Sequence, residues 1–246
     1  MPKIAIVGYG QMGKLIEKLA PENGFQVCAI IDPLLGNDLS DPVLQDADVC
    51  VEFSSPQAVR SNLRSLIELK KQIVCGTTGW QEHLPEILEL VTKNGTGFVY
   101  GSNFSFGMNL FYEIVAHATQ LMNSAENYDP YGLEMHHHRK KDSPSGTAKI
   151  LSDMVLQNIE RKTQSQYEKL DRQIRPEEFH FASIRAGEIP GTHLIGFDSD
   201  ADNIELKHTA RNRNGLALGA LKAAHWIIGK KGSYDFSGIF REILKG

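Results

Sequence analysis

The sequence has no long apolar run, few cysteines and no excess of positive charge. Of its 246 residues three are cysteine, and 26 Lys and Arg face 30 Asp and Glu, for a net charge of −4. We therefore expect no membrane span and no broad binding to nucleic acid. Because no C-x-x-C spacing occurs, we interpret Cys28, Cys50 and Cys75 as buried reduced thiols. Together with the absence of a secretory pattern before the first strand signal, this predicts a cytoplasmic protein.

Strand and helix patterns alternate over the first hundred residues. Apolar, β-branched runs predict strands at residues 3–7, 26–31, 49–53, 72–75 and 97–100. Apolar residues at helical spacing predict helices at 14–20, about 58–67 and 84–91. This repetition is typical of a doubly wound parallel sheet of the Rossmann type.

The pattern changes after about residue 105. We expect helices at 108–122, 144–159 and 216–228, and strands at 131–138, 179–185, 193–198 and 203–209, with a polar surface loop at 161–177. These elements indicate a second, α+β domain built on a mixed, mostly antiparallel sheet.

A G-x-G-x-x-G motif directly follows the first expected strand and opens the first helix. Its residues are Gly8, Tyr9, Gly10, Gln11, Met12 and Gly13. Gly8 permits a tight turn, Gly10 lets the backbone approach a pyrophosphate, and Gly13 permits close packing of helix on strand. The helix N-terminus offers free N–H groups to phosphate. This context favours a dinucleotide site over a structural glycine turn.

Asp32 ends the second expected strand, 19 residues after Gly13, where a carboxylate accepts hydrogen bonds from an adenosine ribose. A carboxylate there repels a 2′-phosphate, and Pro33 rather than Arg follows it. We therefore predict that NADH is preferred and that NADPH is possible. Loops after the later strands should border the same crevice; they are 54–56, 76–79 and 101–104.

Positive charge is concentrated in one segment of this acidic chain. Residues 136–141 read His-His-His-Arg-Lys-Lys and lead to a helix start at Ser143-Pro144-Ser145-Gly146-Thr147. Side-chain cations and a helix N-terminus both attract anions, so the segment suits a small dicarboxylate. A solvated basic face is one alternative. A metal site using His136 and His138 is another, but neighbouring cations repel a metal and no third ligand is obvious, so we expect none.

These residues resemble the 4-hydroxy-tetrahydrodipicolinate reductase (dihydrodipicolinate reductase) family over nearly the whole chain. The most specific match is E-x-H-H-x-x-K-x-D-x-P-S-G-T-A at residues 134–148. Support comes from the glycine loop, from 76–79 and 102–105, from R-x-G…G-x-H at 185–193, and from a stretch at 208–220. Three departures are a glycine loop one residue shorter than usual, Leu216 in place of Phe, and no Arg after Asp32.

The resemblance implies reduction of 4-hydroxy-tetrahydrodipicolinate with NADH or NADPH, in the diaminopimelate route to lysine. It implies a proton donor and acceptor in His136 and a proton donor in Lys140. It implies substrate binding by His137, Ser145, Gly146 and Thr147, and cofactor binding by the six glycine-loop residues, Asp32, Gly76, Thr77, Thr78, Gly101, Ser102, Asn103 and Phe104. A histidine near neutral pKa and a lysine suit the protonation step.

The resemblance also implies a discontinuous nucleotide domain, residues 1–104 and 213–246, around a central substrate domain, residues 105–212. The central domain would supply a homotetramer interface. Two other functions share parts of this pattern. Another Rossmann oxidoreductase, such as a homoserine- or aspartate-type dehydrogenase, would not need the 136–148 segment. A nucleotide-sensing module would bind NADH without turnover.

Overall fold

The structure is a computed structural model and describes residues 1–245 of the chain. The chain divides into two compact units, one of Met1–Asn109 together with the segment from Arg213 onward, the other of Leu110–Asn212. None of the helices within the described residues combines the length and the apolar character that a bilayer span requires. Three cysteines are free thiols, and two of them, Cys50 and Cys75, are buried.

The first unit is built on a six-stranded sheet in which every neighbouring pair is parallel. Its order is β11-β5-β4-β3-β1-β2, with β1 (Lys3–Val7), β2 (Gln26–Ile31), β3 (Val49–Glu52), β4 (Gln72–Cys75), β5 (Gly97–Tyr100) and β11 (Gly232–Asp235). This confirms the predicted doubly wound sheet. The edge strand β11 was not predicted, because its Gly-Ser-Tyr-Asp sequence carries no apolar run.

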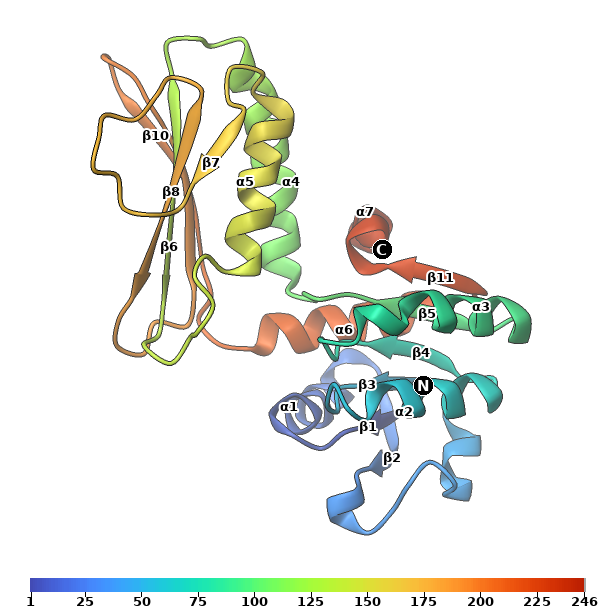
Figure 1. Ribbon diagram of the computed structural model, residues 1–246. Coiled ribbons are helices and arrows are strands. Elements are labelled where there is room, and N and C mark those ends of the chain that lie inside the picture. The colour runs from blue at the N-terminus through green and yellow to red at the C-terminus, as the bar shows by residue number, and fades with distance from the viewer. Residues whose placement is uncertain (246) are drawn as a thin grey trace. The chain divides into compact units, whose positions relative to one another are not determined.

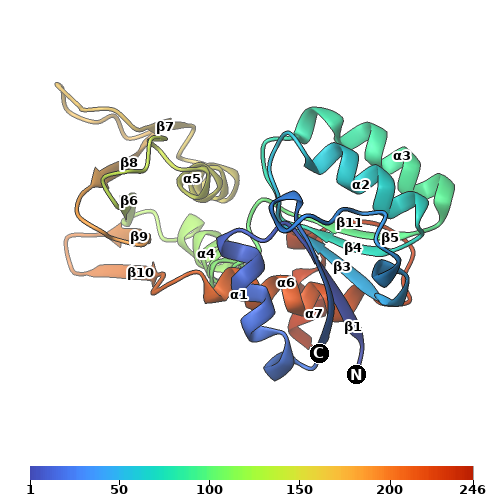
Figure 2. The ribbon, with the colours of Figure 1, turned by 90° about the horizontal axis from the view of Figure 1, so that it is seen from below.

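Helices cover both faces of this sheet (Figure 2). One face carries α1 (Gln11–Leu19), α6 (Asn214–Ile227) and α7 (Phe236–Lys245), and the other carries α2 (Val59–Glu68) and α3 (Leu84–Asn94). The strand period of two explains why Ile4 and Ile6 enter one core while Ala5 and Val7 enter the other. Helix α6 lies close to the chain that follows β5, since a Cβ on Gly219 would come within 1.7 Å of the Phe104 carbonyl oxygen.

Short 3-10 turns join several of these elements. They are η1 (Pro21–Asn23), η2 (Pro33–Leu35), η3 (Pro42–Asp46) and η4 (Gln81–His83). The carboxylate of Asp32 accepts a hydrogen bond from the Leu34 amide at the start of η2, which fixes the side chain at the end of β2.

The second unit is built on a mixed five-stranded sheet of order β10-β9-β6-β8-β7. Its elements are most of α4 (Phe106–Asn123), then β6 (Asp129–His136), α5 (Gly146–Asn158), β7 (Gln164–Gln166), β8 (Glu178–Arg185), β9 (Thr192–Asp198) and β10 (Asn203–Thr209). Two neighbouring pairs are antiparallel and two are parallel. The predicted mixed sheet is therefore confirmed, whereas the expectation that most of its pairs are antiparallel is wrong. The helix α5 returns the chain between β6 and the parallel β7–β8 pair, and β7 lies where a surface loop was expected.

Helices α4 and α5 lie on one face of this second sheet (Figure 1). Along β6, alternate residues are buried toward that face, including Gly132, Glu134 and His136. The intervening residues Tyr131, Leu133 and Met135 are half-buried on the opposite face. This alternation brings a carboxylate and a histidine two residues apart to the same side of the strand.

Candidate active site

The turn after β1 is tight on two sides and open on a third. Gly8 has φ +92°, and its amide donates to the Ile31 carbonyl at 2.8 Å. A Cβ on Gly13 would meet the Gly8 carbonyl oxygen at 2.2 Å, so only glycine permits this packing. A Cβ on Gly10 would meet no atom within 4 Å. Helix α1 starts there without a side-chain cap, and its first N–H groups are left for an anion.

Asp32 lies beside this turn, where its carboxylate is held by two backbone amides. Its oxygens accept hydrogen bonds from the Tyr9 amide at 2.7 Å and from the Leu34 amide at 2.9 Å. The acid is therefore oriented before any ligand arrives, as recognition of a ribose diol requires.

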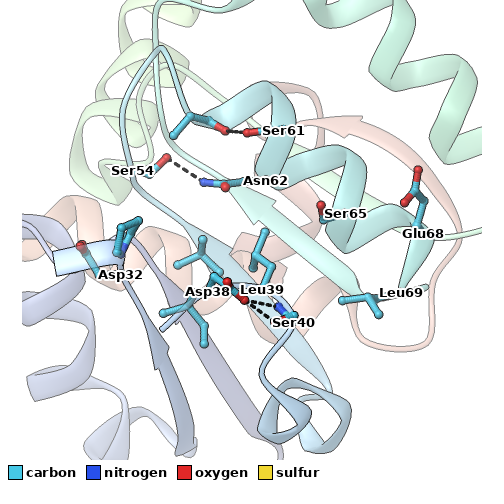
Figure 3. Close-up of a pocket in the computed structure, with 15 residues that line it drawn as sticks. Asp32, Asp38, Leu39, Ser40, Ser54, Ser61, Asn62, Ser65, Glu68 and Leu69 are labelled. Atoms are coloured by element: carbon cyan, nitrogen blue, oxygen red, sulfur yellow. Dashed lines mark hydrogen bonds between the residues drawn. The ribbon is translucent and has the colours of Figure 1, made fainter. Parts of the chain in front are cut away.

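A cavity of about 550 Å³ opens between the ends of β1 and β2 and helix α2 (Figure 3). Three carboxylates line it, from Asp32, Asp38 and Glu68, and no lysine or arginine is among the residues that line it in the described part of the chain. Ser40, Ser54 and Asn62 add hydroxyl and amide groups. Such a cavity fits a sugar and a flat base and opposes additional negative charge.

Two smaller hollows adjoin the same end of the sheet. One of about 300 Å³ is lined by Gly10, Gln11, Met12, Gly76, Thr77 and Thr78, together with Phe53, Ser54 and Pro56. Another of about 240 Å³ is lined by Thr77, Gly101 and Ser102, among others. Most of the predicted cofactor residues therefore line connected loops at the carboxyl ends of parallel strands, where nucleotides bind in such sheets. These residues fit a dinucleotide.

Four predicted cofactor residues line none of these hollows. The Tyr9 hydroxyl donates to Glu17, and Gly13 packs against Gly8. Phe104 is 2% exposed, and its ring packs against that of Phe236 with centroids 4.5 Å apart and a tilt of 39°. Asn103 accepts a hydrogen bond from the Ser105 amide at 2.9 Å at the start of α4. These four residues support the loops instead of lining the hollows.

Two features of the crevice were missed by sequence reasoning. The wall residues Asp38, Ser40 and Asn62 lie on a turn and a helix that carry no motif. Glu52, fully buried at the end of β3, accepts hydrogen bonds from the Ser54 hydroxyl and, at 3.1 Å, from the Asn62 amide. Its only sequence signal is a carboxylate that ends an otherwise apolar strand.

In the second unit, Glu134 is the centre of a buried polar cluster. Its side chain is completely buried, and one oxygen, Oε1, accepts from the Ser145 amide at 3.0 Å, the Ser183 hydroxyl at 2.8 Å and the Arg185 guanidinium at 2.8 Å. The other oxygen, Oε2, accepts from the Ser145 hydroxyl. A buried carboxylate is tolerated only with such complete pairing.

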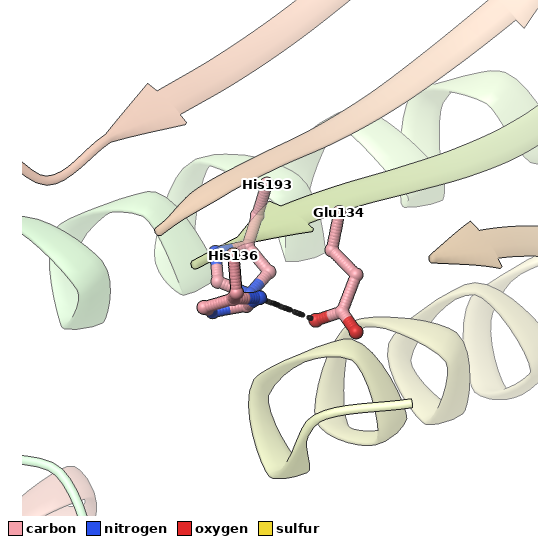
Figure 4. Close-up of side chains that lie close together, drawn as sticks. All are labelled: Glu134, His136 and His193. Atoms are coloured by element: carbon pink, nitrogen blue, oxygen red, sulfur yellow. Dashed lines mark ion pairs between the residues drawn. The ribbon is translucent and has the colours of Figure 1, made fainter. Parts of the chain in front are cut away.

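Two histidine rings approach Oε2 of the same carboxylate (Figure 4). His136 Nδ1 lies 3.5 Å from it and His193 Nε2 lies 3.4 Å from it. The two rings meet edge to face with centroids 5.0 Å apart. Both histidines are more than nine-tenths buried. The parallel and antiparallel pairing of β8 and β9 with β6 brings Arg185, Glu134 and His193 together although they are far apart in sequence.

Burial lowers the pKa of His136 to about 4, and the electrostatic effects of His193, Lys140 and Arg185 act in the same direction, whereas Glu134 opposes them. Burial alone would raise the pKa of Glu134, but contacts from His193, Ser145 and Arg185 hold it well below its usual range. His136 is therefore neutral at pH 7 in the ligand-free protein. The expected near-neutral pKa is wrong for this state, because the sequence did not show how deeply β6 is buried.

Ser145 connects this cluster to α5. It is the N-cap of the helix, and its hydroxyl accepts from the Ala148 amide at 3.1 Å while donating to Glu134. Gly146 is exposed, and a Cβ there would meet no atom within 4 Å; Thr147 is half-buried. The start of α5 is thus held in place by the contact between Ser145 and Glu134, while Gly146 leaves it accessible to solvent, as anion binding requires.

The expected cluster of cations is largely paired with anions. The Lys140 ammonium contacts the Asp142 carboxylate at 2.8 Å, which lowers the pKa of that carboxyl. Arg139 pairs with Glu188 on the surface. His138 lies beyond the end of β6, with its Nδ1 2.9 Å from the Gly187 carbonyl oxygen, whereas His137 is half-buried with no partner on its buried Nδ1. Arg185 and His193, absent from the predicted site, are the cationic and imidazole groups that the fold adds.

Glu134, His136 and His193 also offer atoms that all lie within 4.8 Å of one another, the arrangement of a metal-binding triad. The sequence argument that no third ligand is available therefore fails. The carboxylate, however, is already bound by a guanidinium and by a hydroxyl proton, and both would have to move for a cation to enter.

Comparisons with known proteins agree across the whole chain. The family described as "Dihydrodipicolinate reductase, N-terminus" matches residues 2–104, and "Dihydrodipicolinate reductase, C-terminus" matches residues 107–240. The chain is 33% identical over 243 residues to 4-hydroxy-tetrahydrodipicolinate reductase of Christiangramia forsetii, covering 98% of this chain and 99% of that one. It is 34% identical to the enzyme of that name from Thermosipho africanus, covering 98% of each.

A solved structure shares the fold. It is a dipicolinate-bound dihydrodipicolinate reductase from Paenisporosarcina sp. TG-14, with a TM-score of 0.75 and 21% identity over 98% of this chain and 99% of that one.

The lowered pKa of His136 predicts acid lability of the second unit. Its ordinary pKa is 6.5, so below pH 6.5 the unfolded chain takes up a proton that the folded chain refuses until about pH 4. Stability is therefore lost as pH falls through this window, by at most about 3 kcal/mol. Hydrogen exchange of β6 amides, corrected for intrinsic rates, should show a steeper acid loss in the wild type than in His136→Gln. Equal slopes would contradict the prediction.

Proposed function

We propose, since the chain belongs to the dihydrodipicolinate reductase family, that it reduces 4-hydroxy-tetrahydrodipicolinate with a nicotinamide cofactor in lysine and diaminopimelate biosynthesis. The observation that carries this proposal is the buried Glu134–His136–Ser145 cluster, which joins a proton-carrying side chain to a helix N-terminus that binds anions. The Rossmann unit fits the cofactor, which supplies the hydride when bound. An enzyme of this kind, with free thiols, suits the cytoplasm.

The substrate carboxylates are proposed to bind at the start of α5 and along the segment before it. The backbone N–H groups of Gly146 and Thr147 face the anion, and His137 adds a ring nitrogen. Ser145, expected to bind substrate, donates its amide and hydroxyl protons to Glu134 and acts by fixing the start of the helix. Lys140 exchanges its exposed partner Asp142 for the ligand, at low cost because surface ion pairs are weak.

Proton delivery is assigned to His136 and Lys140. Hydride addition to an imine-like ring creates negative charge that an acid must neutralise. Two ligand carboxylates beside His136 favour its protonated form, so its pKa rises on binding from the low value of the ligand-free protein. The ring then gives the proton at Nε2, because Nδ1 faces Glu134.

Turnover should be seen when the product of dihydrodipicolinate synthase and NADH are supplied and absorbance of the reduced nicotinamide is followed. His136→Gln and Lys140→Ala should each lower kcat by about 10²–10⁴-fold while NADH binding persists. The matched controls are His138→Gln and Lys141→Ala, in the same segment but exposed, which should stay near wild type. No oxidation by the wild type would reject the reductase assignment and favour a nucleotide-binding module.

We propose NADH as the preferred cofactor. Asp32, Asp38 and Glu68 line the proposed ribose cavity, and none of the described residues around it is a Lys or Arg, so a 2′-phosphate would meet only like charge. NADPH remains a substrate of lower efficiency, since the cavity is open to solvent that screens charge.

The wild type should show a kcat/KM for NADH at least tenfold above that for NADPH. Asp32→Ser should lower the ratio of the two kcat/KM values. The main cause should be a lower kcat/KM for NADH, because its ribose hydroxyls lose the carboxylate that accepts their hydrogen bonds. Asp200→Ser, an equal charge change at an exposed position of the second unit, is the control and should leave the ratio unchanged. A strong NADPH preference in the wild type would contradict the assignment.

A homotetramer is proposed to form through the face of the second sheet that α4 and α5 leave open. Tyr131, Leu133 and Met135 are half-buried on this face, and Ile184 is 43% exposed beside Met135. A sheet face with this apolar content is typical of a subunit contact.

Light scattering should give the mass of four chains for the wild type and a smaller mass for Ile184→Lys, which places a charge in the proposed contact. Ile150→Lys, at an exposed position of similar accessibility on α5, is the control and should remain tetrameric. A monomeric wild type would overturn the proposal.

A further inference from the structure

We propose that His193 is a positioning residue for His136, acting through the single Glu134 oxygen that both rings approach, Oε2. This inference rests on the proposed role of His136 as the proton-carrying group. It concerns a residue on β9 that the sequence motif around His136 does not contain.

The contacts determine which nitrogen of each ring carries hydrogen. The Ser145 hydroxyl donates its proton to Oε2 of Glu134, so His193 Nε2, 3.4 Å from both atoms, must itself be the donor toward them. The Nδ1 atom of His193 is buried and has no hydrogen-bond partner in the described chain. A neutral ring protonated at Nε2 satisfies both observations.

The same reasoning applies to His136. Its Nδ1 makes no hydrogen bond to the described residues, but it faces the Glu134 carboxylate oxygen Oε2 at ion-pair distance, 3.5 Å. The attraction of this anion favours hydrogen on Nδ1, which leaves Nε2 as the free acceptor. A Cβ on Gly191 would lie 3.3 Å from that Nε2, so the glycine backbone borders this nitrogen without a side chain in the way. The atom that exchanges a proton with the ligand is therefore set by the carboxylate behind the ring.

His193 sets how strongly that carboxylate attracts the His136 proton. The groups that face the His136 ring are Glu134 on the same strand, Lys140 after it, Arg185 on β8 and His193 on β9. Arg185 binds Oε1, so His193 is the only one of these cationic or imidazole groups that contacts Oε2. The N–H of His193 takes up part of the hydrogen-bonding capacity of Oε2. Its ring, edge to face with that of His136, fixes the orientation of His136.

Removal of the donor should make Glu134 a stronger acceptor and raise the proton affinity of His136. His193→Phe fills the space without a donor, and His193→Asn is polar but too short to reach Oε2. His193→Gln reaches with an amide N–H in place of the ring N–H and is the rescue variant. The fold of each variant is checked by circular dichroism. If His193→Phe does not fold, His193→Asn is used as the variant that lacks the donor.

The titration of His136 in the ligand-free protein, followed by NMR of its ring Cε1–H and assigned with His136→Gln, tests the proposal without turnover. The midpoint should move up by about one pH unit in His193→Phe and His193→Asn and stay near that of the wild type in His193→Gln. Equal midpoints in all proteins, or equal shifts in Gln and Phe, would overturn it.

A kinetic measurement separates this inference from the proposed function. His193→Phe and His193→Asn should lower kcat and shift its pH profile, with KM for NADH unchanged, whereas His193→Gln should recover most of the activity. If His136→Gln keeps full activity, the catalytic assignment fails even if the NMR shifts occur. If His136→Gln is inactive and the NMR midpoints do not move, only the role of His193 fails.

Discussion

The buried carboxylate of Glu134 is the interaction on which the second unit depends. It holds the start of α5 through Ser145, strand β8 through Arg185 and Ser183, and the ring of His193 on β9. Loss of one partner of a buried charge pair leaves the other without compensation, which costs several kcal/mol. Structural and chemical roles therefore coincide in our proposal, since the contacts that bury the charge also orient His136, the proposed proton carrier.

The first unit depends on a different constraint, the close approach of backbone to backbone. Gly8, Gly13 and Gly219 each stand where a side chain would strike a main-chain atom. These contacts compact the sheet, α1 and α6 enough that the strand ends form a cavity with a preset carboxylate. Asp32 is held by amides of both the glycine turn and η2, so its position follows from the turn and not from the ligand.

Much of the fold was predictable because its signals are local. Apolar runs marked β1 to β5, and the glycine motif marked the turn before α1. The edge strand β11 and the short β7 were missed because they have few apolar residues and depend on pairing with β5 and β8. A mixed second sheet was predicted, but its two parallel pairs were not, since strand direction depends on how α5 connects β6 to β7 and β8, which periodicity does not encode.

Prediction of the site was limited in the same way: contacts within one motif could be predicted, and contacts that depend on strand pairing could not. Lys140 and His136 belong to one contiguous motif, so their proximity was predictable. Arg185 and His193 reach Glu134 only through the β6–β8 and β6–β9 register. The depth of burial that lowers the pKa of His136 also arises from packing, so the expectation of a near-neutral pKa for this residue was wrong for the ligand-free protein.

Charge pairing connects these observations. A segment with three adjacent cationic residues, Arg139, Lys140 and Lys141, would repel itself in a dry site, and the fold avoids this by giving Arg139 and Lys140 carboxylate partners. The Arg185–Glu134 pair is buried and fixed, whereas Lys140–Asp142 is accessible and weak. In the proposed function, a dicarboxylate takes the half-buried lysine from the exposed Asp142 without disturbing the buried pair. His136, neutral beside that pair in the ligand-free protein, leaves room for one added proton. In the proposed reaction, the negative charge of the ligand stabilises that proton and thereby provides the acid that reduction of the ligand requires.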